Sequence, residues 1–149
     1  MDLRMDAAEL QVFLEREFPQ VNNEYRIEAL APHSISVRLA VQNRHLRPGG
    51  TVSGPTMFAL ADVTVYLAVL AMIGPRALAV TTNCSIDFMR RPASGADLIA
   101  ECKLLKLGRI LAVGDVLIHS DGVAAPVARA TLTYSIPPVG VETASPAGA

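Results

Sequence analysis

A single carboxylate lies inside the most apolar segment of the sequence. Asp62 falls within the run from Gly54 to Pro75, and this run contains no Lys or Arg that could neutralise it. A buried carboxylate is costly unless it is paired, hydrogen-bonded or protonated. A carboxylate held against apolar surface is suited to act as a general base or a nucleophile. The alternative is a structural role, in which loop N–H groups or solvent satisfy its oxygens.

A glycine eight residues before Asp62 marks the start of the same segment. Pro55 suits the first position of a helix, because its missing N–H is not needed there, and this puts Gly54 at the N-cap. The N–H of such a residue points out of the helix end, where the helix dipole adds partial positive charge, and it can hold a developing oxyanion. Taken alone, Gly54 is better explained as a plain helix cap.

The spacing between these two residues indicates a site shared by two chains. Eight residues of helix rise by about 12 Å, whereas a reacting carbonyl carbon must lie about 3 Å from both the oxyanion donor and the attacking group. One chain cannot easily bring Gly54 and Asp62 that close to one atom. Two antiparallel helices that meet across a dimer can, so the spacing predicts a dimer in which each chain completes the site of the other.

No other set of residues forms a recognisable catalytic or metal-binding pattern. The histidines lack the spacing of metal ligands, and the sequence has no nucleophilic serine motif, phosphate-binding loop or dinucleotide-binding fingerprint. Neither a metal nor a redox cofactor is expected. Cys84 and Cys102 form no paired motif and are expected to be reduced core residues.

The elements that must position Asp62 are predicted from hydrophobic periodicity. Residues 6–18 have the apolar spacing of a short leading helix, and residues 25–41 alternate as one or two strands. A Pro-Gly-Gly loop then leads into the long apolar helix from Gly54 to Ile73. An Asp-Gly hairpin signal falls at residues 121–122. Four alternating segments follow the helix, at residues 81–88, 98–105, 110–119 and 124–136.

A helix that is apolar on every side must be enclosed, and a curved antiparallel sheet can wrap around it. The sequence therefore predicts an α+β hotdog fold, as one domain over residues 1–136. The small, Pro-rich tail at residues 137–149 is expected to be disordered. The edge strands and the outer face of such a sheet need cover, which favours a homodimer or a dimer of dimers, that is, a homotetramer.

Composition and charge exclude several classes of function. The net charge of −1 provides no field that would favour nucleic acid or an anionic membrane surface. A membrane span is disfavoured because a charge such as Asp62 costs about 2.5–3.5 kcal/mol at the bilayer centre. The N-terminus does not have the pattern of a signal peptide, because charged residues interrupt it at Asp2, Arg4, Asp6 and Glu9. A cytoplasmic protein that binds neither nucleic acid nor membrane is expected.

Several motifs occur in a fixed order along the chain. The long helix begins with GPTMFALAD at residues 54–62, and IDFMRRPA, GADL, Gly-Arg and Asp-Gly-Val follow at residues 86–93, 95–98, 108–109 and 121–123. With this set, the sequence from residue 38 to residue 134 resembles the phenylacetate-degradation (PaaI-like) thioesterases, a family of hotdog enzymes that hydrolyse acyl- or aryl-CoA thioesters. At the helix start that family has His-Gly-Gly, a few apolar residues and Leu-Ala-Asp, and the ordered set is far more specific than any one motif.

The resemblance implies a role for each matching residue. Asp62 matches the catalytic carboxylate, which activates water or attacks the thioester, and Gly54 matches the glycine whose N–H polarises the thioester carbonyl. Thr81 falls near the position at which some relatives have a small hydroxyl residue that helps to hold water. The substrate would carry CoA, whose phosphates need cations at the strand ends, and the candidates are Arg90, Arg91, Lys106 and Arg109.

The sequence departs from the family pattern at three positions. Ser53 replaces the motif histidine, and Pro55 replaces the second glycine. Arg47 stands where many relatives have an asparagine. The side chain of that asparagine is a polar group that affects the orientation of water, and this chain lacks it.

Two other functions stay open on the sequence alone. A hotdog protein can bind acyl-CoA without hydrolysing it, although no helix-turn-helix pattern precedes the hotdog region to make it a DNA-binding sensor. His45 and Asp62 could also imitate the His-carboxylate pair of hotdog acyl-CoA dehydratases or hydratases, although the residues around His45 (RHLRPGG) match that pattern poorly.

Overall fold

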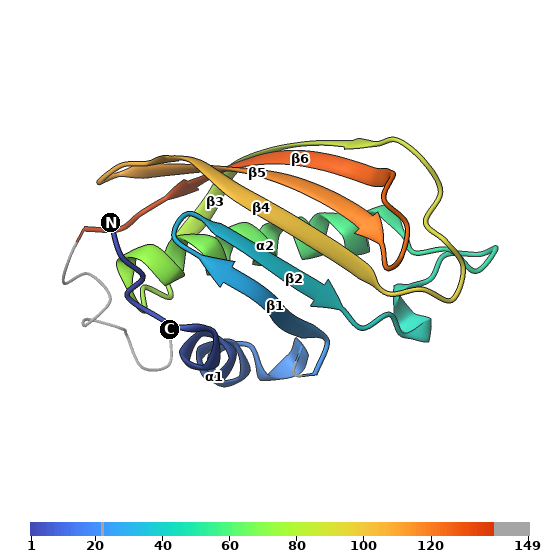
Figure 1. The fold of residues 1–149 in the computed structure, drawn as a ribbon, viewed down its shortest axis with the longest axis horizontal. Coiled ribbons are helices and arrows are strands. Elements are labelled where there is room, and N and C mark those ends of the chain that lie inside the picture. The colour runs from blue at the N-terminus through green and yellow to red at the C-terminus, as the bar shows by residue number, and fades with distance from the viewer. Residues whose placement is uncertain (22, 139–149) are drawn as a thin grey trace.

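The computed structural model describes residues 1–21 and 23–138, and one long helix lies at its centre (Figure 1). Helix α2 runs from Gly54 to Ile73, the bounds that the sequence predicts. It is long and apolar enough to cross a membrane, but 67% of its most apolar window is buried inside the fold. It is therefore the core helix of this domain. The predicted tail, residues 137–149, lies outside the described residues beyond Pro138.

The residues at its two ends explain where α2 begins and stops. Ser53 is the N-cap, because its Oγ accepts the N–H of Thr56 over 3.3 Å. The prediction that placed Gly54 at the N-cap is wrong by one residue, since a serine hydroxyl can accept that N–H and glycine has no side chain to do so. Gly54 and Pro55 are instead the first two helical residues. Gly74 ends the helix with a φ of +94°, which strains any L side chain.

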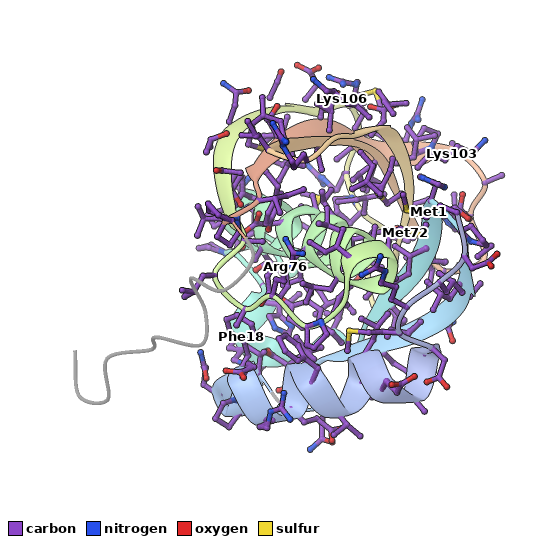
Figure 2. All side chains as sticks on the ribbon, turned by 90° about the vertical axis from the view of Figure 1, so that its left-hand side faces the viewer. Met1, Phe18, Met72, Arg76, Lys103 and Lys106 are labelled. Atoms are coloured by element: carbon purple, nitrogen blue, oxygen red, sulfur yellow. The ribbon has the colours of Figure 1, made fainter. Side chains whose placement is uncertain are left out.

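Six antiparallel strands form one sheet that curves around α2, as Figure 2 shows with the helix seen nearly end-on. The strands are β1 (Tyr25–Ala31), β2 (Ser34–Leu39), β3 (Val80–Phe88), β4 (Leu98–Leu107), β5 (Leu111–Ser120) and β6 (Pro126–Ser135). Their order is β1-β2-β4-β5-β6-β3, so β1 and β3 are the edges. This architecture confirms the predicted α+β arrangement, and the segment 25–41 forms two strands.

Helix α1, Ala7–Glu17, covers part of α2 that the sheet leaves open (Figure 1). Asp6 caps its first turn in a reciprocal capping box. The rings of Phe13 and Phe18 pack against Tyr66 of α2, with centroids 6.4 and 5.7 Å away. The predicted leading helix is therefore confirmed, and its aromatic residues close the core beside the C-terminal half of α2.

The sheet comes very close to α2 at Gly114 of β5. A Cβ atom at this position would lie 2.9 Å from both γ-methyl carbons of Val65 and 3.3 Å from Sγ of Cys102. Real Cβ atoms essentially never approach carbon to 2.9 Å. The absence of a side chain at Gly114 thus lets the middle of the sheet lie directly on the helix.

The edge strand β3 has little cover on the described chain. None of its residues is buried, and β6 is its one neighbour in the sheet. Among the residues of α2 that stay at least partly open, five form one stripe at helical spacing, namely Pro55, Phe58, Ala59, Asp62 and Val63. Exposed apolar side chains on and beside β3 extend this surface, at Leu78, Val80, Phe88 and Met89. Apart from Asp62, the stripe on α2 is therefore apolar.

Candidate active site

Asp62 lies half-buried on α2, beneath the strand pair β3–β6. Two hydroxyl groups converge on its Oδ1: Thr81 of β3 donates one short hydrogen bond, and Tyr134 of β6 donates another over 2.7 Å. Thr81 and Tyr134 are register partners, so the pairing of the strands brings the two donors together. The Tyr134 hydroxyl also lies 3.0 Å from the main-chain oxygen of Asp62. The carboxylate is thus satisfied by strand hydroxyls and not by loop N–H groups.

The second carboxylate oxygen of Asp62 is open. Within the described residues Oδ2 has no hydrogen-bond donor, and no buried side-chain oxygen or nitrogen lacks a partner. Oδ2 is therefore accessible to solvent. The two hydroxyls fix the carboxylate through Oδ1 and leave Oδ2 to accept a proton or to attack, which is the geometry that a general base or a nucleophile requires.

Tyr134 is a site residue that the sequence analysis missed. The residue is only 3% exposed, and burial, followed by the charge of Asp62, raises the pKa of its phenol well above 10.0. The phenol therefore stays protonated and remains a donor. A tyrosine in an alternating strand is most simply interpreted as a core residue, and only the register with Thr81 shows its second role.

Cys84 lies near the same carboxylate, on the strand that carries Thr81. Burial raises the pKa of its thiol above 9.0, and the charge of Asp62 adds to the rise. Both cysteines are free, as expected; Cys102 is a buried core residue, whereas Cys84 is half-buried beside the site. A thiol with a raised pKa is a poor nucleophile at neutral pH, so Cys84 is disfavoured as a nucleophile at this site.

Gly54 has the free N–H at the beginning of α2. Pro55 has no N–H, Thr56 donates to the hydroxyl of Ser53, and Met57 donates to the Ser53 carbonyl over 3.2 Å. Of the first-turn donors in the described chain, Gly54 alone lacks an acceptor. The helix dipole concentrates partial positive charge at this end. An oxygen that becomes negative at this point would be stabilised by the N–H of Gly54.

A pocket of about 370 Å³ surrounds Gly54 and contains three arginines. Arg47 comes from the loop before α2, and Arg90 and Arg91 lie in the segment after β3, separated from it by Met89. Phe88 forms one wall, and its ring would lie 3.3 Å from a Cβ atom at Gly54. The structure thus brings two predicted CoA-binding cations, Arg90 and Arg91, together with the predicted oxyanion donor.

The other two predicted cations lie at the opposite end of the sheet. Lys106 is near the end of β4, and Arg109 lies in the turn that follows and lines a separate pocket with Arg76. The ten residues of β4 span about 30 Å, which separates this turn from Arg90 and Arg91. One chain therefore does not bring all four cations together.

His45 is not a partner of Asp62 in this structure. Its Nε2 lies 2.6 Å from Oε1 of Glu24, and its Nδ1 accepts the N–H of Gln42 over 2.9 Å. The His-carboxylate pair that a dehydratase would need is therefore not formed with Asp62. Across residues 1–21 and 23–138, no three His, Cys, Asp or Glu side chains are placed to hold a metal ion.

Comparison with known proteins identifies the family. The model of the Thioesterase superfamily matches residues 49–126. A protein of Silicibacter sp. TM1040, assigned as a thioesterase, has a solved structure with 63% identity, 93% coverage of this chain, 96% coverage of that chain and a TM-score of 0.87. A mutant of the phenylacetic acid degradation protein PaaI from Thermus thermophilus is 30% identical, with 80% and 99% coverage and a TM-score of 0.68.

A more distant structure agrees in fold. A hypothetical thioesterase of Streptococcus pneumoniae TIGR4, solved with coenzyme A, is 24% identical, with 87% and 97% coverage and a TM-score of 0.72. No curated protein sequence matches the chain. The family match spans more than half of the chain and includes the start of α2 and Asp62. The chain therefore belongs to the thioesterase superfamily, has the hotdog fold of its structural neighbours, and is similar to the PaaI proteins, as its motifs indicate.

Proposed function

We propose that this protein hydrolyses acyl-CoA thioesters to a free acid and CoA, in a site that two copies of the chain form together. The observation that carries the proposal is the carboxylate of Asp62, which two hydroxyls hold at Oδ1 and which is open at Oδ2. Membership of the thioesterase superfamily supports a thioester as the substrate. The coenzyme A in the Streptococcus pneumoniae structure and the arginines beside Gly54 support CoA as its carrier group.

The proposed dimer follows from the open apolar surface along β3 and α2. An edge strand and an apolar helical stripe both need cover, and a second copy supplies the same two elements. If the two α2 helices pack antiparallel, the residue midway between positions 54 and 62 lies nearest the two-fold axis. This residue is Phe58, whose side chain is 40% exposed. Each Asp62 would then face Gly54 of the partner subunit.

The proposed reaction uses both halves of this shared site. The thioester carbonyl oxygen accepts the N–H of Gly54 from one subunit, which makes the carbonyl carbon more electrophilic. Oδ2 of Asp62 from the other subunit removes a proton from water as the water oxygen attacks that carbon; alternatively, Oδ2 attacks and water cleaves the resulting anhydride. The carbon–sulfur bond breaks, the sulfur takes up a proton, and the CoA thiol and the acid leave.

The same proposal assigns the binding of the CoA phosphates to Arg90 and Arg91, two of the three arginines that line the Gly54 pocket. A guanidinium binds phosphate oxygens through its planar fork. Lys106 and Arg109 would need another subunit to reach the same CoA molecule, because they lie at the far end of β4. Arg90 and Arg91 are therefore the first pair to substitute when CoA binding is measured.

Release of free thiol from a panel of acyl- and aryl-CoAs tests the proposed function. We expect release by the wild type and a decrease in kcat of about 10²–10⁴-fold in Asp62→Asn, which keeps an oxygen for Thr81 and Tyr134. Binding of the esters without release by the wild type would indicate a binding module and would contradict hydrolysis. Equal release by Asp62→Asn would leave the enzyme but refute the role of Asp62.

A further inference from the structure

His45 is a buried titratable side chain that the proposed reaction does not use. Only 7% of its surface and 4% of that of Glu24 are exposed. We infer that His45, held by Glu24, is a positioning residue that fixes the main chain at Gly54 and so aims its N–H at the substrate. This inference rests on the proposed function, because it concerns the oxyanion donor of that site.

Both nitrogens of the His45 ring have protein partners. Nδ1 accepts the N–H of Gln42 over 2.9 Å, so the ring carries its proton on Nε2. Nε2 donates this proton to Oε1 of Glu24 over 2.6 Å, a charge-assisted hydrogen bond. The ring is therefore held at two opposite points, and it cannot rotate without breaking one of the two bonds.

Glu24 is itself fixed to the sheet. It directly precedes β1, its N–H donates to the carbonyl of Val21 over 3.1 Å, and its own carbonyl accepts the N–H of Ala40 over 2.8 Å. Its carboxylate also forms a close ion pair with Arg44. The position of the His45 ring is thus set by the ends of the β1–β2 pair.

The main chain of His45 transmits this fixed position to the start of α2. Its carbonyl accepts the N–H of Ser53 over 2.9 Å and the hydroxyl of Thr56 over 3.4 Å. Ser53 is the N-cap and directly precedes Gly54. Ser53 and Thr56, which lie on either side of the oxyanion donor Gly54 in the chain, are therefore both bonded to the carbonyl oxygen of His45.

The loop between His45 and Ser53 folds back on itself and is closed by main-chain pairing. Leu46 and Val52 form an isolated antiparallel bridge. The N–H of Arg47 donates to the carbonyl of Thr51 over 2.9 Å. These pairings close the loop on its base, the His45–Ser53 pair, and Gly54 directly follows this base, so we expect a displaced His45 to displace Gly54.

A preorganised donor matters most in the transition state, when the carbonyl oxygen gains its charge. We expect His45→Ala to lower kcat about tenfold to hundredfold, with KM changed by no more than about threefold. His45→Gln keeps an amide N–H that can reach Glu24 and is expected to recover part of kcat. His119→Ala is the matched control, because it removes a histidine paired with Glu101 at a different site, on β5.

Two ligands and one exchange measurement separate positioning from folding. A trifluoromethyl ketone analogue of the CoA ester mimics the charged intermediate, and a thioether analogue mimics the ground state. We expect His45→Ala to lose affinity for the ketone in parallel with kcat and to keep its affinity for the thioether. Amide hydrogen exchange over residues 53–57 is expected to become faster in His45→Ala and to stay unchanged in His119→Ala.

Three results would overturn the inference: an unchanged kcat, equal losses of affinity for the two analogues, or unchanged exchange over residues 53–57. A wild type that releases no thiol would refute the proposed function instead. The exchange measurement would then decide alone whether His45 fixes the chain at Gly54.

Discussion

At the scale of single residues, two hydroxyls share one oxygen of Asp62. Thr81 and Tyr134 approach Oδ1 from paired strands and leave Oδ2 without a protein donor in the described chain. A hydrogen bond to a charged group is worth more than one between neutral groups. The pair therefore stabilises the carboxylate and fixes the direction in which its free oxygen points.

Replacing Thr81 tests this orientation. Thr81→Val keeps the branched shape but removes the donor, so we expect kcat to decrease about tenfold, the equivalent of one partly exposed charge-assisted hydrogen bond. Thr81→Ser keeps the donor and is expected to retain most of kcat. Steady-state hydrolysis of one CoA ester measures both variants, and equal activities of the Val and Ser variants would show that the hydroxyl does not matter.

Cys84 reports on the charge of Asp62. Burial first and Asp62 second raise the pKa of its thiol above 9.0, so the thiol is protonated at neutral pH and should react with iodoacetamide only as the pH rises past 9. Asp62→Asn removes one of the two causes and should move this rise to lower pH. Mass spectrometry of labelled peptides measures the profile, and Cys102, whose pKa is raised to about 12, is an unreactive internal control. An unchanged profile in Asp62→Asn would contradict the interaction.

Single residues were predictable where they stand out within the sequence itself. Asp62 is a charge in an apolar helix, and Gly54 precedes the proline that marks the start of that helix, whereas Thr81 follows only from the family resemblance. Tyr134 was missed because it is 72 residues away from Asp62, and no local pattern encodes the register of β3 with β6. Ser53 is not predicted as the N-cap, because the rule that favours proline at the first helical position puts Pro55 there, whereas Pro55 is the second helical residue.

At the scale of elements, the site depends on how closely the sheet lies on α2. Gly114 faces Val65, where a side chain on β5 has no room. Asp62 is on the same helix and meets β3 and β6 of the same sheet. A shift between sheet and helix would therefore move Asp62 relative to its two hydroxyl donors.

A substitution at Gly114 tests this close approach. We expect Gly114→Ala to lower the free energy of unfolding by about 1–3 kcal/mol, because the new Cβ overpacks against the methyl groups of Val65. Val65→Ala in the same chain should relieve the contact, so the double variant should be more stable than the sum of the two single effects. Denaturant unfolding of the four proteins measures the cycle, and strictly additive effects would refute the contact.

The amphipathic elements were predicted well because each has a clear period. The range of α2 was predicted from the glycine and proline at both ends of an apolar run, but its N-cap was placed one residue too late. The alternation over residues 25–41 predicts one or two strands without deciding between them. The turn between β1 and β2 uses Pro32 and His33, and His33 adopts a φ of +64°, which its residue type does not predict. The position of β3 beside β6 depends on the closure of the whole sheet, and local periodicity carries no information about it.

At the scale of the whole molecule, the proposed dimer turns two incomplete half-sites into complete ones. Phe58 lies between Gly54 and Asp62 on the open stripe of α2 and would meet Phe58 of the partner subunit near the two-fold axis. We expect Phe58→Asp to produce monomers that lose thioesterase activity while remaining folded, because two buried like charges repel.

Sedimentation of Phe58→Asp alongside Leu117→Asp checks this expectation. Leu117 is also exposed but lies on β5, outside the proposed interface, so its variant should keep the dimer and the activity. If a dimer of dimers used this outer face, the Leu117→Asp variant would dissociate into dimers that keep their activity. Full activity of monomeric Phe58→Asp would show that one chain suffices.

A test that each site takes Gly54 from one chain and Asp62 from the other requires a variant that removes the N–H of Gly54. Gly54→Pro removes this N–H and adds a side chain beside Phe88. The helix start should accept it, because proline is favoured at the first helical position and Ser53 already has the extended backbone that precedes a proline, with φ −75° and ψ 155°. Gly54→Ala keeps the N–H and makes the same new contact with Phe88, so it is the matched control.

Co-expression of Asp62→Asn with Gly54→Pro tests the shared site most directly. Each variant alone should be nearly inactive, but a mixed dimer contains one site with both an intact Gly54 and an intact Asp62. Random pairing should therefore restore about a quarter of the wild-type activity per chain in a two-fold dimer. A mixture no more active than either variant alone, with mixed dimers present, would contradict a site shared between subunits.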